Sequence, residues 1–518
     1  MRKCLIPLLF LAAGLGAAEG PRSPFETGAE PAPRGRIDEL VFGKLKELGA
    51  RPAFPCSDEV FLRRAYLDVI GTLPTPEEAW QFLQDPDPNK RAALIDGLLE
   101  RPEFADYWAM KWSDLLRVKS EFPINLWPNA VQAYYRWIRT SIADNVPYDR
   151  FVREMLAASG SNFRAAPVNF YRATQSHDPQ ALAQIVALTF MGTRAEKWPK
   201  ARLDGMAGFF SRIGFKPTGE WKEEIVYFDA SKPPEPAVFP DGKAARLTSG
   251  QDPREAFANW LLAPENPWFA RNIVNRVWYW LMGRGIVQEP DDIRADNPPA
   301  NPELLAYLER ELAASRYDLK RIYRLILNSQ TYQLSPIPRD SRPEAAANFA
   351  SYPLRRLDAE ALIDAVCQIT GTTEPYSSPI PEPFTFLPEG QRSIALPDGS
   401  IGSAFLEMFG RPPRDTGLES ERNNRPSAEQ RLHMLNSTHI QQKIQQSTKL
   451  RALFQGRPGG RPRDPIDRLY LAILSRTPTD EELRTAAAYF QSVPGNKWPA
   501  AVDLSWALIN SAEFSYRH

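Results

Sequence analysis

Cysteine and histidine are scarce in this 518-residue chain, which has 3 cysteines and 4 histidines. Cys4 lies in a leader that we expect to be removed, so the mature chain would keep Cys56 and Cys367. Two cysteines cannot build a disulfide framework, and the sequence leaves open whether they pair or stay as buried thiols. A structural zinc site is excluded as well, because it needs about four clustered cysteine or histidine ligands.

An excess of charge of either sign is also missing, since 63 basic residues balance 63 acidic ones. Proteins that bind nucleic acids are usually basic, so we expect no nucleic-acid partner. No run of lysine and arginine indicates binding to an anionic membrane surface. No apolar run reaches the ~20 residues that a membrane-spanning helix requires, so we expect no transmembrane anchor.

The first residues have the order of a secretory signal peptide. Arg2 and Lys3 precede a short apolar run, residues 5–15, and small residues follow at 16–18. We therefore expect a signal peptide over residues 1–18 and export to the periplasm or the extracellular space. Residues 19–35 are rich in Pro, Gly and Glu without an apolar period, which predicts a disordered lead-in.

Proline is abundant, with 49 residues, and many prolines directly follow a capping residue. Asn266-Pro267 and Asn301-Pro302 both have this pattern, which is typical of a helix start. The first of these helices has an apolar residue at every fourth position, which indicates one buried face: Phe269, Ile273, Val277 and Leu281. Gly283 would end it, and a polar loop over residues 289–301 would join the two helices.

The overall pattern predicts a mainly α, multi-helical protein of two domains with long loops and a small β element near residues 220–250. Residues 225–228 are the best strand candidate, and the change of composition there places a domain boundary near residue 248. The domains would span residues 36–247 and 248–518. The Pro/Ser/Gly-rich loop of residues 372–402 is long enough to be functional or disordered.

Two stretches near opposite ends of the chain resemble each other. Residues 64–68 and 75–78 match residues 468–472 and 479–482, and both copies contain a Thr followed three residues later by a Glu. This spacing is a capping box. A repeated helical unit and a shared local solution to capping explain the likeness equally well, so both interpretations stay open.

Residues 105–160 are rich in aromatic side chains at helical spacing. Such a stripe favours a core over a platform for a cofactor or a sugar. Its members are Tyr107, Trp108, Trp112, Trp127, Tyr134, Tyr135 and Trp137.

Longer motifs resemble a known family. In the first half they are residues 60–64, 67–71 and 73–75; in the second half they are residues 275–278, 283–287, 291–294, 297–299, 355–360, 409–414 and 421–422. In these motifs the chain resembles exported planctomycete and verrucomicrobial proteins of uncharacterised function. Those proteins join a planctomycete cytochrome C type domain of unknown function to a planctomycete-specific domain of unknown function.

The haem motif of that family is missing. Many relatives carry Cys-x-x-Cys-His after a Gly-Thr-Arg phrase, where two thiols bind the haem and the histidine ligates its iron. Here Gly192-Thr193-Arg194 runs directly into residues 195–198, so we expect no covalent haem and no other cofactor. A Cys-x-Cys of the relatives is likewise absent from residues 418–422. Non-covalent haem through His177, His433 or His439 is disfavoured, since ordinary hydrogen-bonded side chains are the commoner role of histidine. The space left by haem would be filled by Trp198, Met206, Phe209 and Phe210.

Two charged loops of the second domain form the candidate site. The first group comprises Asn275, Arg276, Arg284, Asp291, Asp292 and Arg294; the second comprises Arg411, Arg414, Glu421 and Arg422. Guanidinium groups bind anions and acidic sugars well, so the second group is a candidate ligand site. The alternative is an internal ion-pair network that ties this loop to Asp291 and Asp292. Calcium binding is less favoured than a loop in which Arg284 and Arg294 pair with these carboxylates, because the spacing fits no EF-hand.

Two functions therefore stay open. One is a non-catalytic exported binding or scaffold protein, related to cytochrome-c-type proteins but without covalent haem. The alternative is an extracytoplasmic enzyme that acts on polysaccharide through the polar loops of the C-terminal domain. The absence of a Gly-x-Ser-x-Gly elbow and of other nucleophile or metal motifs favours the first. Its partner is unknown; an acidic glycan or another exported protein would suit it.

Overall fold

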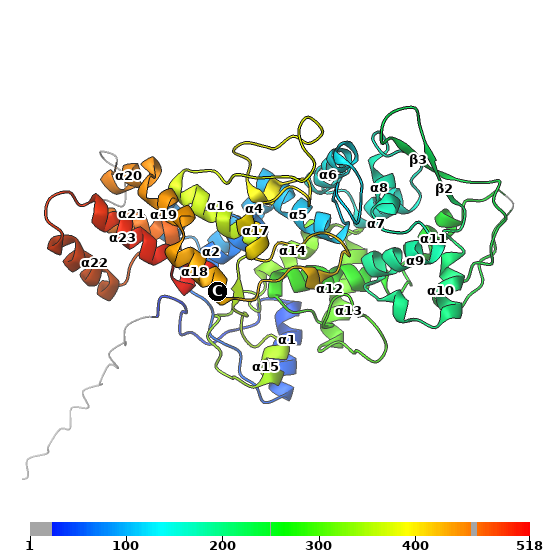
Figure 1. The fold of residues 1–518 in the computed structure, drawn as a ribbon. Coiled ribbons are helices and arrows are strands. Elements are labelled where there is room, and N and C mark those ends of the chain that lie inside the picture. Colours follow the sequence, from blue (N-terminus) through cyan, green and yellow to red (C-terminus); the bar gives the residue numbers. More distant parts are fainter. Residues whose placement is uncertain (1–22, 249, 457–463) are drawn as a thin grey trace, which may run out of the picture.

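Helices dominate the computed structural model, which describes residues 23–248, 250–456 and 464–518 (Figure 1). The predicted signal peptide, residues 1–18, lies outside these residues. In the first half the helices are α1 (Arg36–Glu47), α2 (Asp58–Val69), α3 (Pro76–Gln84), α4 (Lys90–Leu99), α5 (Pro102–Leu115), α6 (Pro128–Ala143), α7 (Tyr148–Leu156), α8 (Asn169–Arg172), α9 (Pro179–Val186) and α10 (Lys200–Ala207). In the second half they are α11 (Pro253–Leu261), α12 (Phe269–Met282), α13 (Pro302–Ala314), α14 (Leu319–Asn328), α15 (Pro343–Ala347), α16 (Ala359–Thr370), α17 (Ala404–Met408), α18 (Ala428–Asn436), α19 (Thr438–Gln445), α20 (Thr448–Gln455), α21 (Pro465–Leu474), α22 (Asp480–Ser492), α23 (Trp498–Ile509) and α24 (Ala512–Ser515). The mainly α prediction is confirmed.

The predicted β element is a small antiparallel sheet in the order β1-β3-β2. Its strands are β1 (Gly160–Ser161), β2 (Ile213–Pro217) and β3 (Glu224–Phe228), and β3 contains the strand predicted at 225–228. The sheet lies with α9 and α10 at the end of the molecule opposite α20–α23 (Figure 1). A second, two-stranded sheet pairs β4 (Arg355–Arg356) with β5 (Tyr516–Arg517).

The hydrophobic residues divide into two cores, but not at residue 248. The first core draws mainly on residues from Ile37 to Tyr352, together with Ile394 and Leu471, and the second draws mainly on residues from Leu357 to Phe514. Helices α11–α15 therefore pack with the first half of the chain. In the other direction, Leu67 and Leu73 join the second core. The packing of apolar side chains thus changes from one core to the other near residue 354, and the domain boundary near residue 248 stays a prediction.

Capping side chains fix the helices around the candidate site. Asn266 Oδ1 accepts hydrogen bonds from the backbone N–H groups of Trp268 and Phe269, and Asn301 Oδ1 accepts one from Leu304. At the other end of α12, Gly283 has φ +69°. A Cβ there would collide with the side chain of Arg355, which crosses this helix end. Glycine at 283 is thus required both by the backbone and by Arg355.

The two similar stretches share helix order and capping contacts. Capping boxes join Thr75 to Glu78 and Thr479 to Glu482. In both copies the box glutamate also pairs with an arginine, Arg101 at 2.9 Å and Arg476 at 2.7 Å. The likeness in sequence thus extends to the same three-helix arrangement, α2–α3–α4 and α21–α22–α23.

Part of the expected disordered lead-in lies against the protein. Glu26 forms a β-bridge with Cys56, and the backbone N–H of Thr27 donates to Pro55 O at 2.9 Å. Residues 19–35 were predicted to be disordered. Within the described part of this segment, Glu26 and Thr27 instead pair with the backbone of the residues just before α2. No helix in the described part of the chain is long and apolar enough to cross a membrane.

Candidate functional site

A polar cleft of about 680 Å³ lies where the two cores meet. Residues from α5, the end of α12, the two-stranded sheet and the loop before α18 form its walls. Six lining residues are basic and three are acidic: Lys111, Arg355, Arg356, Arg422, Arg425 and Arg517, with Glu289, Asp358 and Glu419. Positive charge therefore predominates in the lining.

Asp358 is the most heavily contacted carboxylate of this cleft. Its Oδ2 lies 2.9 Å from Lys111 Nζ and 2.8 Å from Arg517 Nη2. Asn424 Nδ2 donates to Oδ1 at 2.8 Å, and Arg422 approaches to 3.6 Å. Burial raises the pKa of Asp358, but Lys111, Arg517 and Arg422 more than offset this and hold the pKa well below its ordinary value.

The arginines of the second predicted group, on residues 411–422, bind buried carboxylates, although Arg422 also lines the cleft. Arg414 Nε lies 2.9 Å from Asp114 Oδ1, and Arg422 Nη2 lies 2.6 Å from Asp114 Oδ2. Arg422 also pairs with Glu360 at 2.7 Å, and Arg411 approaches Glu360 to 3.6 Å. The three arginines thus bind carboxylates of α5 and α16, one from each core.

Glu421 binds backbone groups of its own loop, whereas the neighbouring arginines bind carboxylates. Its carboxylate accepts hydrogen bonds from the backbone N–H groups of Thr416, at 2.6 Å, and Asp415, at 3.3 Å. Burial raises the pKa of this carboxyl group. Glu421 therefore holds the loop in shape and does not contact the cleft lining.

The two predicted groups meet at Asp291. Arg276 Nη2 lies 2.6 Å from Asp291 Oδ1, and both side chains are almost fully buried. The backbone N–H of Glu419 donates to Asp291 Oδ2 at 2.7 Å. Asn275 stands beside them and binds both the N–H and the C=O of Val287. The loop is thus tied to Asp291 by a backbone hydrogen bond and through Arg276, whereas its described arginine side chains pair with Asp114 and Glu360.

The remaining members of the first group lie at the surface. Arg294 pairs with Asp292 at 3.2 Å and with Asp296 at 3.3 Å. Arg284 is exposed and has no ion pair among the described residues, so the expected pairing of Arg284 with this loop is wrong. In the same part of the chain, no group of three or more His, Cys, Asp or Glu side chains is arranged to hold a metal ion.

Several residues of the cleft were not singled out from the sequence as site residues. Arg355, Arg356 and Asp358 belong to the motif at 355–360, so that motif could have indicated them. Lys111 lies in the aromatic helix α5, and Arg517 lies near the other end of the described chain. Nothing in the sequence places these two beside Asp358.

Two arginines in the cleft lack a carboxylate partner. Arg356 binds the side-chain amide of Gln430, and its guanidinium stacks 4.5 Å from the ring of Phe409. Arg425 is exposed. Across the described chain no ion pair forms with either of them. Neither charge is neutralised by a carboxylate of the described chain, although Arg356 is only 8% exposed, whereas Lys111, Arg422 and Arg517 contact Asp358.

A second hollow of about 290 Å³ adjoins the cleft and shares three lining residues with it: Arg356, Pro426 and Tyr516. This hollow adds Arg431, which is exposed. The two hollows are together lined by three guanidinium groups that have no ion pair among the described residues: Arg431 in the second hollow, Arg425 in the cleft, and Arg356, which lines both. Such a row suits an extended anionic molecule better than a small ion.

Glu419 places a carboxylate on the cleft wall. The indole N–H of Trp280 donates to its Oε2 at 3.0 Å, and Arg276 approaches the same oxygen to 3.4 Å. Burial raises the pKa of Glu419, and the charge of Arg276 offsets this only in part. A buried carboxyl with a raised pKa in a cleft is a pattern that also occurs at catalytic sites.

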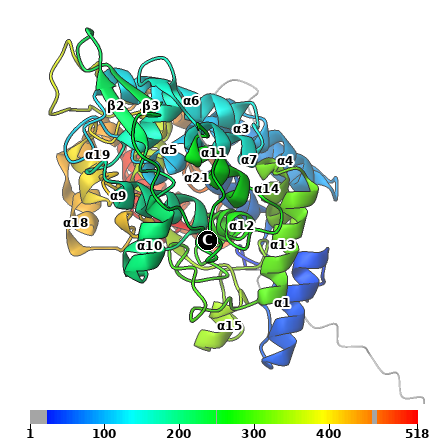
Figure 2. The same ribbon diagram turned by 90° about the vertical axis from the view of Figure 1, so that its right-hand side faces the viewer.

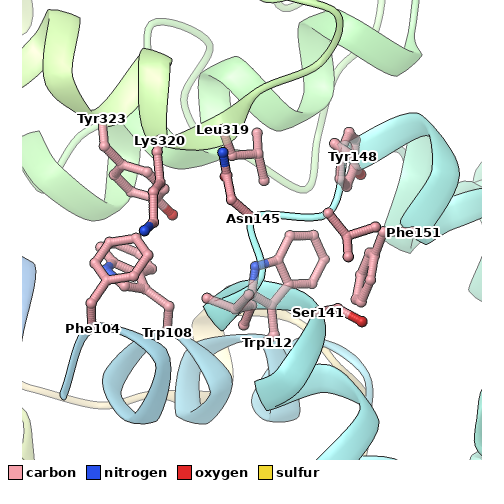
Figure 3. Close-up of a pocket in the computed structure, with 12 residues that line it drawn as sticks. Phe104, Trp108, Trp112, Ser141, Asn145, Tyr148, Phe151, Leu319, Lys320 and Tyr323 are labelled. Atoms are coloured by element: carbon pink, nitrogen blue, oxygen red, sulfur yellow. The ribbon is translucent and has the colours of Figure 1, made fainter. Parts of the chain in front are cut away.

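The aromatic residues at 105–160 were predicted to lie in the core. Trp108 and Trp112 confirm this, since they are 2% and 3% exposed. They line a narrow crevice beneath α14 (Figure 3). Its volume of about 30 Å³ has room for about one water molecule. A ligand platform is thus absent from this crevice, although Trp127 takes part in a different arrangement described below.

The residues that flank the missing haem motif are only partly as expected. Met206, Phe209 and Phe210 are buried in the first core. Trp198 is half-buried instead, with Arg202 stacked 4.0 Å from its ring. Trp198 packs against the first core as predicted for a filler, but it is only partly buried. Cys56 and Cys367 are both free thiols.

Comparison with known proteins identifies two domains. The family model PSCyt2, protein of unknown function (DUF1549), matches residues 36–198, and the model PSD1, protein of unknown function (DUF1553), matches residues 253–490. Neither a curated protein nor a solved structure matches the chain significantly. The chain therefore joins a PSCyt2 domain to a PSD1 domain, both of unknown function, in the order that its motifs indicated.

Proposed function

We propose that this protein is an exported, non-catalytic binding protein that takes an acidic ligand in the cleft between its two cores. The observation that carries the proposal is the row of guanidinium groups without carboxylate partners, Arg431, Arg356 and Arg425, along two adjoining hollows. An acidic glycan has the chemistry that this row would recognise, since its carboxylates or sulfates repeat along a chain.

The arginines of the cleft that lack an ion pair are better suited to binding a ligand than to stabilising the fold. Arginines that stabilise this fold are paired: Arg422 contacts Asp114 and Glu360 within 2.7 Å. Arg425 and Arg431 are exposed, so they contribute little to the stability of the fold. A guanidinium that faces a cleft and is not neutralised attracts anions and steers them toward the site.

The proposal includes loss of the haem that many relatives bind. The Gly192-Thr193-Arg194 phrase runs directly into the turn of Ala195–Lys197, and no cysteine lies near it in the sequence. Met206, Phe209 and Phe210 are packed in the first core beside this turn. Without the thiols of a Cys-x-x-Cys-His motif the chain cannot attach haem through thioether bonds.

The alternative is an extracytoplasmic enzyme that acts on polysaccharide. One observation favours it: the carboxyl of Glu419, whose pKa burial raises, lies on the wall of the same cleft. Such a carboxyl can serve as a general acid. A second carboxylate with the role of base or nucleophile would also be required.

A panel of acidic glycans tests these functions. Polygalacturonate, alginate and chondroitin sulfate would be titrated into the purified mature protein by calorimetry, and each mixture would be assayed for new reducing ends. Saturable binding without new reducing ends is expected. New reducing ends that disappear in Glu419→Gln would establish the enzyme instead, and absence of both would overturn the proposal.

A further inference from the structure

Three aromatic rings from loops that are distant in sequence meet at the surface, away from the cleft. Ring centroids lie 4.6 Å apart for Trp127 and Trp221, 5.1 Å apart for Trp221 and Phe384, and 6.0 Å apart for Trp127 and Phe384. Trp221 stands at the tip of the β2–β3 hairpin, which reaches toward the yellow-green loop that carries Phe384 (Figure 2, upper left). We call these three residues the aromatic cluster.

The cluster is exposed to a degree that is unusual for aromatic residues. Trp221 is 58% exposed and Phe384 is 48% exposed. The three rings are inclined to one another by 55° to 78°, so they do not close into a stack. Large exposed apolar groups that gather in one place mark a binding surface more often than they occur without a function.

The loops that carry the cluster are held in place. Trp127 and Lys222 have φ values of +72° and +61°, a backbone region that bulky residues rarely adopt. Asn162 Nδ2 donates to Lys222 O at 3.1 Å. Beside it, the buried Glu223 accepts hydrogen bonds from Ser161 and Thr218 at 2.5 Å and 2.7 Å. The backbone around Trp127 and Trp221 is therefore set in advance, and strain of this kind gathers at functional sites.

The charges near the rings decide which kind of ligand fits. Lys222 Nζ lies 5.1 Å from the centroid of Trp127 and 5.9 Å from that of Trp221. Glu121 and Glu382 lie in the same loops as Trp127 and Phe384. With charges of both signs, the surface has no basic excess to attract an anionic membrane or an acidic polymer.

The exposed apolar residues of these loops are also of one type. They are all aromatic: Phe122, Trp221, Phe384 and Phe386. A membrane-inserting or protein-docking surface would usually include Leu, Ile or Met as well. Sugar rings instead present C–H groups on one face, which pack on the electron-rich faces of aromatic rings, and hydroxyls at their edges, which bind polar groups.

We propose that Trp127, Trp221 and Phe384 form a second binding site, which stacks on the apolar face of an uncharged sugar ring in a polysaccharide. This site is independent of the acidic-ligand cleft and does not rest on the function proposed for it. It would place a neutral glycan against the hairpin end of the first core.

Affinity electrophoresis in gels that contain hydroxyethylcellulose, glucomannan, laminarin or xylan tests this site. At least one of these neutral polysaccharides should retard the wild-type protein. The double variant Trp221→Ala/Phe384→Ala should bind that polysaccharide at least tenfold more weakly. Tyr489→Ala, which removes an exposed aromatic residue on α22, is the matched control and should bind like the wild type. Unchanged circular dichroism would show that each variant is folded.

Separate variants test the two proposed binding sites independently. Trp221→Ala/Phe384→Ala should leave binding of acidic glycans unchanged, and Arg425→Ala should leave binding of neutral glycans unchanged. The inference is overturned if no neutral polysaccharide retards the wild type, or if the double variant is retarded equally. Binding to phosphatidylcholine vesicles, or self-association, that the double variant loses would also overturn it, because the cluster would then serve a membrane or a protein.

Discussion

Arg422 and Glu360 form a buried ion pair, with 2.7 Å between Nη1 and Oε2. Glu360 lies on α16 of the second core. The other arm of Arg422 contacts Asp114 of α5, in the first half of the chain, at 2.6 Å. One guanidinium thus joins the two cores behind the cleft.

Replacement of Arg422 by Met should lower the free energy of unfolding by ~3 kcal/mol, because Glu360 would stay buried with only Arg411 at 3.6 Å and Asp114 with only Arg414. Urea denaturation followed by circular dichroism would measure it. Arg425→Met removes an exposed arginine nearby and should change stability by less than ~0.5 kcal/mol. Equal effects of the two substitutions would contradict a joining role for Arg422.

Phe209 is fully buried and Trp198 is only partly buried, so truncation of the two side chains should differ in its cost to stability. Phe209→Ala should cost ~3–5 kcal/mol, as for other fully buried aromatic residues. Trp198→Ala should cost clearly less, since this side chain is half-buried under Arg202. Thermal melting of both variants checks the order, and a larger loss for Trp198→Ala would show that it fills the core after all.

Stability should fall on mild acidification because of His518. Burial, and next the charge of Arg63, lower the pKa of this imidazole from 6.5 to about 4. The unfolded chain therefore binds the proton more readily between these values, and stability is lost as pH falls below 6.5. The loss from this residue should reach ~2 kcal/mol at pH 5. Urea denaturation at pH 7 and at pH 5 measures this loss. In His518→Gln the loss of stability between the two pH values should be smaller than in the wild type by this amount. An equal loss in both proteins would speak against a buried neutral histidine.

The purified mature protein should contain no covalent haem. The thiols that form thioether bonds are missing after Arg194, and Cys56 and Cys367 lack the required spacing. The absorption spectrum of denatured protein checks this. A Soret band that stays with the unfolded chain would refute it.

Local signals in the sequence were enough to predict the helices. Asn301 caps α13 as its Asn-Pro pattern indicated, and Gly283 ends α12 with a left-handed backbone. These features depend on a few adjacent residues. The division into cores depends on distant ones: Leu67 packs with residues beyond 356 although it lies near the start of the chain. Composition alone could not reveal that contact.

The sequence indicated some residues of the candidate site but not their surroundings, because those depend on contacts between distant parts of the chain. Motifs identified Arg276, Asp291 and Arg422, but the sequence does not say whether an arginine faces a cleft or a carboxylate. Arg422 turned out to be paired, whereas Arg356, two residues before Asp358, lines both hollows. Likewise Trp127 has helical spacing with core aromatics, and only the tertiary fold brings Trp221 to within 4.6 Å of it.

The central claim is that the cleft binds an acidic ligand through unpaired arginines, and a pair of opposite charge changes tests it most directly. For an acidic glycan that binds the wild type, calorimetry should show a several-fold rise in Kd for Arg425→Ala/Arg431→Ala and a fall in Kd for Glu289→Gln, which removes an exposed negative charge from the same lining. Arg484→Ala, on the exposed surface of α22, is the control. Both effects should shrink as salt is raised. Kd values that stay unchanged in both cleft variants would contradict the account.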